Sequence, residues 1–299
     1  MISVQSCTLC GSKNLKLFDQ SEFKGYSVTN WLCQYCGLVT LSPRLSDEEL
    51  AEFYSAEYRQ MYQGSQEPTA KDLEVQRGRA KHLAELAREA LPQCRSHLDI
   101  GCSAGLLMQA IAQTHCTTIG VEPGDAYRNY CIHQGLTVYP NLETLKVKQP
   151  DKFDLITMSH VLEHISDPVD YLIMLRTELL NSSGILLIEV PNLYGHNCFE
   201  IAHSYSFSPH TLKQTLQKAG FAVEQMKQHC LPRKTTRLLY LTAIARPFSH
   251  PSTAYRVRRN YPWLVYLHRE AGLKGISAFE LLQKRTQKRI DRLFNGSSN

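Results

Sequence analysis

The stretch HLDIGCSAGLLMQAIAQ, residues 97–113, decides the fold of this 299-residue chain. A short apolar run ends at Asp99, a glycine turn begins at Gly101, and the apolar residues after it have helical spacing. This order is typical of a parallel α/β sheet that binds a ligand at its strand ends. The turn matches neither phosphate-binding pattern, because Ser103 and Leu106 stand where the dinucleotide motif has glycines and no Lys-Ser/Thr pair follows.

The residues beyond this turn continue the alternation of strands and helices. Glu122 ends the next apolar run, where an acidic side chain suits a ribose diol. A ligand with a ribose, a carboxylate and no phosphate is S-adenosylmethionine (SAM). We expect further strands at 117–122, 136–140, 153–159, 184–190, 221–228 and 237–245, and helices that begin at Pro168 and Pro209.

Two Cys-x-x-Cys-Gly motifs near the N-terminus predict a four-cysteine zinc ribbon. The doubled spacing suits one tetrahedral ion, and a redox motif would need a helix where short strands are expected. Four protein ligands leave no open position, so the predicted zinc is structural. The predicted ligands are Cys7, Cys10, Cys33 and Cys36.

The composition divides the chain into four predicted parts. These are a zinc ribbon at 1–45, a helical connector or lid at 46–92, a SAM-binding domain at 93–248 and a basic helical segment at 249–299. The connector begins with a Ser46–Glu49 capping box, and its tyrosines 54, 58 and 62 share a helical face that predicts either core packing or an active-site lid.

The net charge of +5 is concentrated at the C-terminal end. Residues 251–299 hold ten Lys and Arg against three Asp and Glu, so the rest of the chain is near neutral. We expect this segment to pack on the protein or to contact another copy, a substrate phosphate, an anionic membrane surface or, as a less favoured partner, RNA. The sequence has no secretory signal pattern and no run of 18 apolar residues, which predicts a cytoplasmic protein.

Four motifs together resemble the class I SAM-dependent methyltransferases. They are LDIGCSAG, Glu122, FDLITMSHVLEHISDP and GILLIEVPN, within residues 96–247. The resemblance implies a Rossmann-like α/β sheet that is mostly parallel, with an antiparallel last strand. The N-terminal stretch from CTLCGS to LSPRLSDEELAEFY is similar to that of zinc-ribbon methyltransferases of sugar and polysaccharide biosynthesis.

The resemblance also implies a cofactor site, position by position. Residues of the glycine turn would line the methionine end of SAM, Glu122 would bind the ribose, and residues after the third and fourth strands would flank the adenine and the sulfonium. The implied set is Asp99, Gly101, Cys102, Ser103, Gly105, Glu122, Pro123, Asn141, Leu142, Ser159 and His160.

Three histidines are candidate general bases, namely His203, His160 and His164. The sugar C-methyltransferases that this chain resembles have a Glu-His pair after the fifth strand, and here Ala202 takes the glutamate place before His203. This departure favours an oxygen or nitrogen acceptor, whose proton a histidine can remove. The run HVLEH matches a metalloprotease signature, but it directly follows a strand, whereas that chemistry needs a long helix.

The sequence thus predicts a methyltransferase with a sugar-type acceptor, such as a nucleotide sugar, a glycan or a lipid-linked intermediate. The alternatives are methylation of RNA or of a small metabolite, and a SAM-binding module without catalysis.

Overall fold

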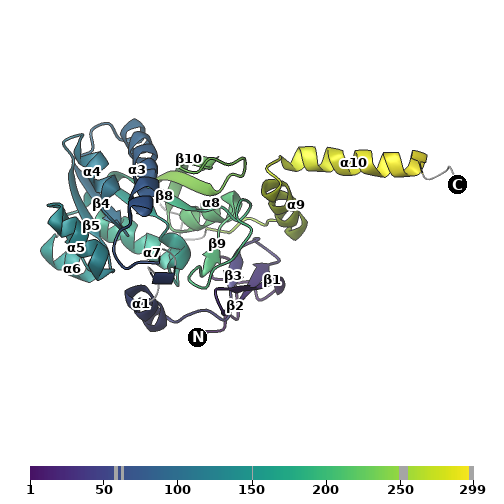
Figure 1. The fold of residues 1–299 in the computed structure, drawn as a ribbon, viewed down its shortest axis with the longest axis horizontal. Coiled ribbons are helices and arrows are strands. Elements are labelled where there is room, and N and C mark those ends of the chain that lie inside the picture. The colour runs from purple at the N-terminus through teal and green to yellow at the C-terminus, as the bar shows by residue number, and fades with distance from the viewer. Residues whose placement is uncertain (57–59, 62–63, 150, 249–254, 296–299) are drawn as a thin grey trace.

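A seven-stranded mixed sheet forms the centre of the molecule in the computed structural model, which describes residues 1–56, 60–61, 64–149, 151–248 and 255–295 (Figure 1). The strand order is β10-β11-β8-β7-β4-β5-β6, and β11 is antiparallel to both neighbours while the strands from β8 to β6 are parallel. The predicted Rossmann-like fold is therefore confirmed. The bounds are β4 Ser96–Ile100, β5 Thr117–Val121, β6 Thr137–Tyr139, β7 Phe153–Ser159, β8 Leu180–Pro191, β10 Phe221–His229 and β11 Tyr240–Pro247.

Helices cover both faces of this sheet, because its strands carry apolar residues on both sides. Leu155 and Leu187 pack with α3 and α4 on one face, whereas their sequence neighbours Ile156 and Leu186 belong to the core under α6, α7 and α8. The bounds are α3 Ala70–Ala90, α4 Leu106–Ala112, α5 Asp125–His133, α6 Leu142–Lys148, α7 Pro168–Met174 and α8 Pro209–Lys218, with a π-turn η2 at Leu175–Leu179.

The expected helix starts are present, and each has a local cause. Asp167 and Ser208 accept backbone N–H bonds at the starts of α7 and α8, with Pro168 and Pro209 next in sequence. The Ser46–Glu49 capping box closes the start of α1, Asp47–Ala56. Tyrosines 58 and 62 and the side chain of tyrosine 54 lie outside the described residues, so the predicted stripe stays a prediction.

A second sheet joins the N-terminal segment to the central domain. Its order is β1-β2-β3-β9, with β1 Leu15–Phe23, β2 Tyr26–Cys33, β3 Val39–Leu41 and β9 Tyr205–Ser206. The pairing of β3 with β9 adds a strand from far along the chain to the N-terminal sheet. Side chains of both segments, such as Leu41 and Ile201, then share one apolar cluster.

The two C-terminal helices have different surroundings. Helix α9, Pro262–Leu273, packs through Val265 into the cluster that also holds Leu32 and Phe199, and the backbone N–H of Asn260 donates to Tyr35 at 2.8 Å. Helix α10, Ala278–Asn295, projects away from the body of the molecule (Figure 1). No helix among the described residues has the length and apolar character needed to cross a bilayer.

Candidate functional site

One cavity of about 1090 Å³ opens at the carboxyl ends of the central parallel strands. The chain reverses its direction of travel across the sheet between β4 and β7, and such a switch point leaves a crevice at the strand ends. The cavity is lined by ten of the eleven predicted cofactor residues and by all three candidate histidines. The sequence-predicted residues therefore lie around one space, although they come from distant parts of the chain.

The turn after β4 brings backbone close to the cavity. Gly101 has φ +73°, and a Cβ there would lie 2.5 Å from Val161 Cγ2, so this position accepts only glycine without movement. Ser103 also has a positive φ, and both residues line the cavity with Cys102. The steric restriction at Gly101 therefore explains how the backbone of this turn can lie close to a ligand in the cavity, as the sequence predicted.

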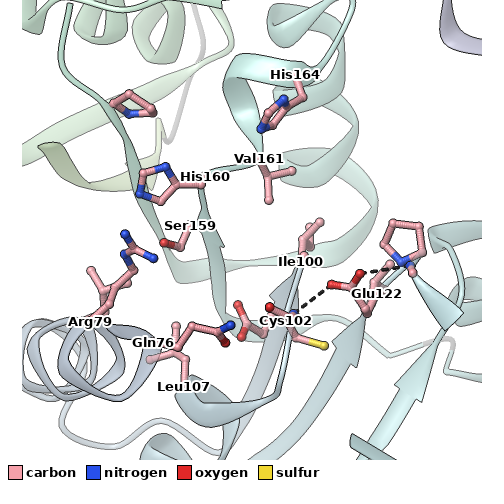
Figure 2. Close-up of a pocket in the computed structure, with 18 of the residues that line it drawn as sticks. Gln76, Arg79, Ile100, Cys102, Leu107, Glu122, Ser159, His160, Val161 and His164 are labelled. Carbon is pink, nitrogen blue, oxygen red and sulfur yellow. Dashed lines mark hydrogen bonds between the residues drawn. The ribbon is translucent and has the colours of Figure 1, made fainter. Parts of the chain in front are cut away.

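Glu122 follows β5, lies beside this turn and is almost fully buried. Its carboxylate accepts the backbone N–H of Ser103 at 2.9 Å and that of Gly124 at 3.0 Å (Figure 2). The two amides fix the orientation of the carboxylate, which has about four acceptor positions. It can therefore accept further bonds from a diol without losing its anchorage.

Asp99 lies beneath the turn in a buried polar chain. Thr157 Oγ1 donates to its carboxylate at 2.6 Å and lies 2.7 Å from His97 Nε2. Burial raises the pKa of Asp99 to about 7, against the opposing effect of the Thr157 hydrogen bond. Burial also lowers the pKa of His97 to about 3, so His97 is neutral near pH 7.

The remaining predicted cofactor residues divide into two groups. Pro123, Asn141 and Leu142 line the cavity beside Glu122, and the Asn141 side chain also caps α6 by accepting the Thr144 N–H at 2.8 Å. Gly105 is the exception, because it is outside the lining. Its φ of +72° begins α4, and its Cα faces the side chains of Leu136 and Cys131, so packing explains the glycine there.

Three further residues of the lining or its support were not predicted from the sequence. Gln76 and Arg79 reach the cavity from α3 (Figure 2), and Gln76 Oε1 accepts the Ala104 N–H at 3.4 Å. Arg79 Nε pairs at 2.7 Å with Glu189, a fully buried carboxylate on β8. A glutamate within the apolar run of 184–190 was a usable signal, since charged residues are rarely buried without a role.

His160 stands at the end of β7 between two buried carboxylates. Its Nδ1 lies 3.4 Å from Glu163 Oε1 and its Nε2 lies 3.4 Å from Glu189 Oε1. The backbone has φ +57°, and the His160 N–H donates to the Glu189 carbonyl at 2.8 Å. Burial and Arg79 lower the pKa of His160, but the two carboxylates outweigh them and raise it.

The other two candidate histidines lie side by side. His164 belongs to the 3₁₀ turn η1, Leu162–His164, and its ring packs edge-on to that of His203 at 4.8 Å between centroids. His203 follows from the loop before β9, and both side chains line the cavity. The HVLEH run thus forms a short turn, which removes the helical geometry of a metalloprotease.

The four predicted zinc ligands converge outside this cavity. Cys7 Sγ lies 3.5 Å from Cys36 Sγ, Cys10 Sγ lies 3.5 Å from Cys33 Sγ, and all four sulfurs are within 4.8 Å of one another. Sulfur atoms about 2.3 Å from a tetrahedral ion have separations of this order, so the donor set fits Zn²⁺.

The fold, the glycine turn and the strand-end cavity are those expected of a class I methyltransferase, and the family comparison shows that the chain is a methyltransferase. The model described as "Methyltransferase domain" matches residues 72–226, which is more than half of the chain. The chain belongs to this family and has the class I SAM-dependent methyltransferase fold.

Individual relatives share only short and moderately similar segments with this chain. Two ubiquinone biosynthesis O-methyltransferases, from Haemophilus ducreyi and Pseudomonas fluorescens SBW25, are 30% and 35% identical to it over 106 and 78 residues. These matches cover 32% and 24% of this chain, and 44% and 34% of the relatives, so the chain spans less than half the length of the curated relatives it matches.

A solved structure shows the same fold over a larger part of the chain. It is a Burkholderia thailandensis 1,6-didemethyltoxoflavin-N1-methyltransferase with its substrate and S-adenosylhomocysteine (SAH) bound. The TM-score is 0.56 at 15% identity, and the match covers 78% of this chain and 100% of that one.

Proposed function

We propose that this protein transfers a methyl group from SAM to a hydroxyl oxygen of a small molecule. One observation carries the proposal. One cavity is lined both by the Gly101–Glu122 region and by the three candidate histidines, and Figure 2 shows Glu122, His160 and His164 around it. Its volume of about 1090 Å³ reaches the top of the roughly 300–1,000 Å³ typical of one small-molecule site, which leaves room for a donor and an acceptor together.

The residues around Glu122 and the glycine turn suit the methyl donor SAM, and this part of the cavity is called the donor end. Glu122 presents a fixed carboxylate for the ribose hydroxyls, and Asp99 and the turn from Gly101 to Ser103 bound the space beside it. Bound SAM supplies an electrophilic methyl group with a good leaving group. The contribution of the chain is to hold an acceptor in line with that methyl group.

His160 is the proposed general base. It lines the cavity next to Ser159, and two carboxylates face its two ring nitrogens. An oxygen acceptor must lose a proton, and an imidazole held in this way is suited to accept it. His164 and His203 then line the acceptor side of the same space.

The acceptor class rests on the relatives' names and on the cavity. Both named relatives are O-methyltransferases, which favours oxygen over nitrogen as the acceptor atom. Their names do not support a sugar, so a sugar-type acceptor stays one candidate among small hydroxylated molecules. The enclosed position of the histidines makes RNA a weaker candidate.

We also propose that Cys7, Cys10, Cys33 and Cys36 hold a structural Zn²⁺ ion. The four sulfurs lie within 4.8 Å of one another and outside the cavity lining. Four thiolates are the ligand set of a closed, tetrahedral Zn²⁺ site. In this proposal residues 1–45 form a ribbon that supports the central domain, rather than a second reaction centre.

The test is label transfer from methyl-labelled SAM into cell extract, separated into small-molecule, nucleotide-sugar, lipid, polysaccharide and RNA fractions. Label in a hydroxylated small molecule supports the proposal, and label in a sugar-bearing fraction selects the sugar-type acceptor. Label in RNA alone contradicts a small-molecule acceptor. SAH binding without label in any fraction indicates a SAM-binding module without catalysis.

A further inference from the structure

Three side chains at the acceptor end of the cavity form a second group of metal-ligand type. They are Glu163 and His164 from η1 and His203 from the loop before β9. One ligand atom from each lies within 4.8 Å of the others. The chain brings them together because β9 pairs with β3 and thereby fixes the loop that carries His203.

The Glu163 carboxylate is the second and independent observation. Its side chain is 1% exposed, and neither oxygen accepts a hydrogen bond from the described residues. Among the described residues, two basic side chains pair with Glu163 Oε1 within 4.0 Å, through His160 Nδ1 at 3.4 Å and His164 Nε2 at 3.9 Å. Buried carboxylates in proteins are hydrogen-bonded, paired or coordinated to a metal, so this one lacks its usual hydrogen bonds.

The histidine rings are oriented as metal ligands commonly are. His164 Nδ1 donates to the Ala202 carbonyl at 2.8 Å, which directs Nε2 toward Glu163. His203 Nε2 lies 3.6 Å from Glu200 Oε2, a carboxylate that can orient this ring in the same way. His164, His203 and Glu200 line the cavity, so the group meets the space of the proposed acceptor.

We propose that Glu163, His164 and His203 bind a first-row divalent cation such as Zn²⁺ or Co²⁺. Two imidazoles and one carboxylate suit these ions and leave coordination positions open toward the cavity. The role of the cation rests on the proposed function. It would hold the acceptor hydroxyl oxygen and make its proton easier to lose, and that proton would pass to the His160 imidazole.

Cobalt titration of the full-length protein tests the site. The four-cysteine site is first loaded with Zn²⁺, and Co²⁺ binding is then followed by calorimetry and by visible absorption. We expect one Co²⁺ per chain, with the weak bands of nitrogen and oxygen ligation and without the intense band of thiolate ligation. Absence of this binding in the wild type overturns the proposal.

Two variants and one control assign the ligands. Glu163→Gln keeps the side-chain shape and removes the charge, and His203→Ala removes a ligand from the other segment. Each should weaken Co²⁺ binding by at least about 10-fold. The control His196→Ala lines the same cavity outside the group and should keep wild-type affinity. Equal affinity in all four proteins contradicts the assignment.

SAH binding by the same samples separates this proposal from the proposed function. A variant that still binds SAH is folded, so its loss of Co²⁺ is a loss of the ligand. If the protein transfers methyl groups but binds no cation at Glu163, His164 and His203, the cation site is refuted and the methyltransferase function still stands. Co²⁺ held by this group, with no hydroxyl acceptor methylated, supports the cation site and refutes the function.

Discussion

At the scale of single residues, the site depends on carboxylates that the fold buries. Asp99 and Glu122 lie at the donor end, and Glu163 and Glu189 surround His160. Three of them have different supports, namely a threonine hydroxyl for Asp99, backbone amides for Glu122 and an arginine for Glu189. Glu163 accepts no hydrogen bond from the described residues. The cost of burying a charge makes these positions sensitive to small changes.

The stability of the protein should depend on the titration of Asp99. Its folded pKa of about 7 is above the ordinary value of 3.8, so the folded state binds the proton more tightly than the unfolded chain. This contribution is full below about pH 4 and is lost as pH rises through about 7. Denaturant unfolding of wild type and Asp99→Asn should show wild type losing stability relative to the variant between about pH 4 and 7. A constant difference would show that Asp99 is not the group responsible.

Replacing His160 should lower the rate of methyl transfer and leave the affinity for the cofactor nearly unchanged. Because His160→Gln removes the proposed base, we expect kcat to fall by about 10²–10⁴-fold. SAH affinity, measured by calorimetry, should change by only a few fold, since Glu122 and the glycine turn are intact. A variant with wild-type kcat would assign proton removal to another group.

At the scale of elements, the turn between β4 and α4 forms part of the cavity wall. Gly101 has a left-handed backbone conformation, and its Cα faces Val161 from the segment after β7. The two strand ends are therefore packed against each other at the point where the cavity begins. A change at either residue acts on both strands.

Gly101→Ala should lower stability and SAH affinity for two separable reasons. The left-handed conformation costs an alanine about 1–2 kcal/mol, and its Cβ would lie 2.5 Å from Val161 Cγ2. Gly135→Ala is the matched control, since Gly135 has φ +77° and open space where a Cβ would stand. Thermal unfolding should show a larger loss of stability for Gly101→Ala than for Gly135→Ala. Adding Val161→Ala to Gly101→Ala should recover the part of the loss that exceeds the control. Equal losses at both glycines would leave conformation as the only cause.

At the scale of the whole molecule, the N-terminal sheet is connected to the wall of the cavity by strand pairing and by a shared apolar cluster. The pairing of β3 with β9 connects the four-cysteine segment to the loop that carries His203. Helix α9 also packs into the same cluster through Val265. Damage at the cysteines should therefore reach the acceptor end of the cavity.

If the four cysteines hold the proposed zinc, its removal should loosen this end of the cavity selectively. After treatment with a strong chelator, hydrogen exchange should increase in β1, β2, β3 and residues 199–206, while β4 and β5 stay protected. The substitution Cys10→Ser should give the same pattern without chelator. Unchanged exchange at residues 199–206 would mean that β9 holds its place without the metal.

The sequence predicted the central sheet because each of its elements has a local signal. The apolar run before Asp99, the Asp167–Pro168 pair and the Ser208–Pro209 pair act within a few residues, and all three appear as expected. The predicted cofactor residues were implied by the resemblance through their positions after strands, and ten of the eleven line the cavity. Gly105 lies outside the lining, because a glycine that the packing requires has the same sequence signal as one that a ligand requires.

The missed parts depend on contacts between distant segments. Arg79 is one of several charged residues on α3, and only the folded chain places it against Glu189. The strand β9 has two residues and no periodicity to detect, yet it completes the N-terminal sheet. Glu163 was noticed only as part of a protease motif, since its approach to His203 depends on that same pairing.

The pairing of β3 with β9 also sets an order of events during synthesis. The cysteine segment is made before the central domain, but one edge of its sheet has no partner until Tyr205 and Ser206 have been made. The apolar cluster on this sheet is completed later still, because Val265 of α9 belongs to it. An early part of the chain therefore reaches its final form only after much of the later part has emerged from the ribosome.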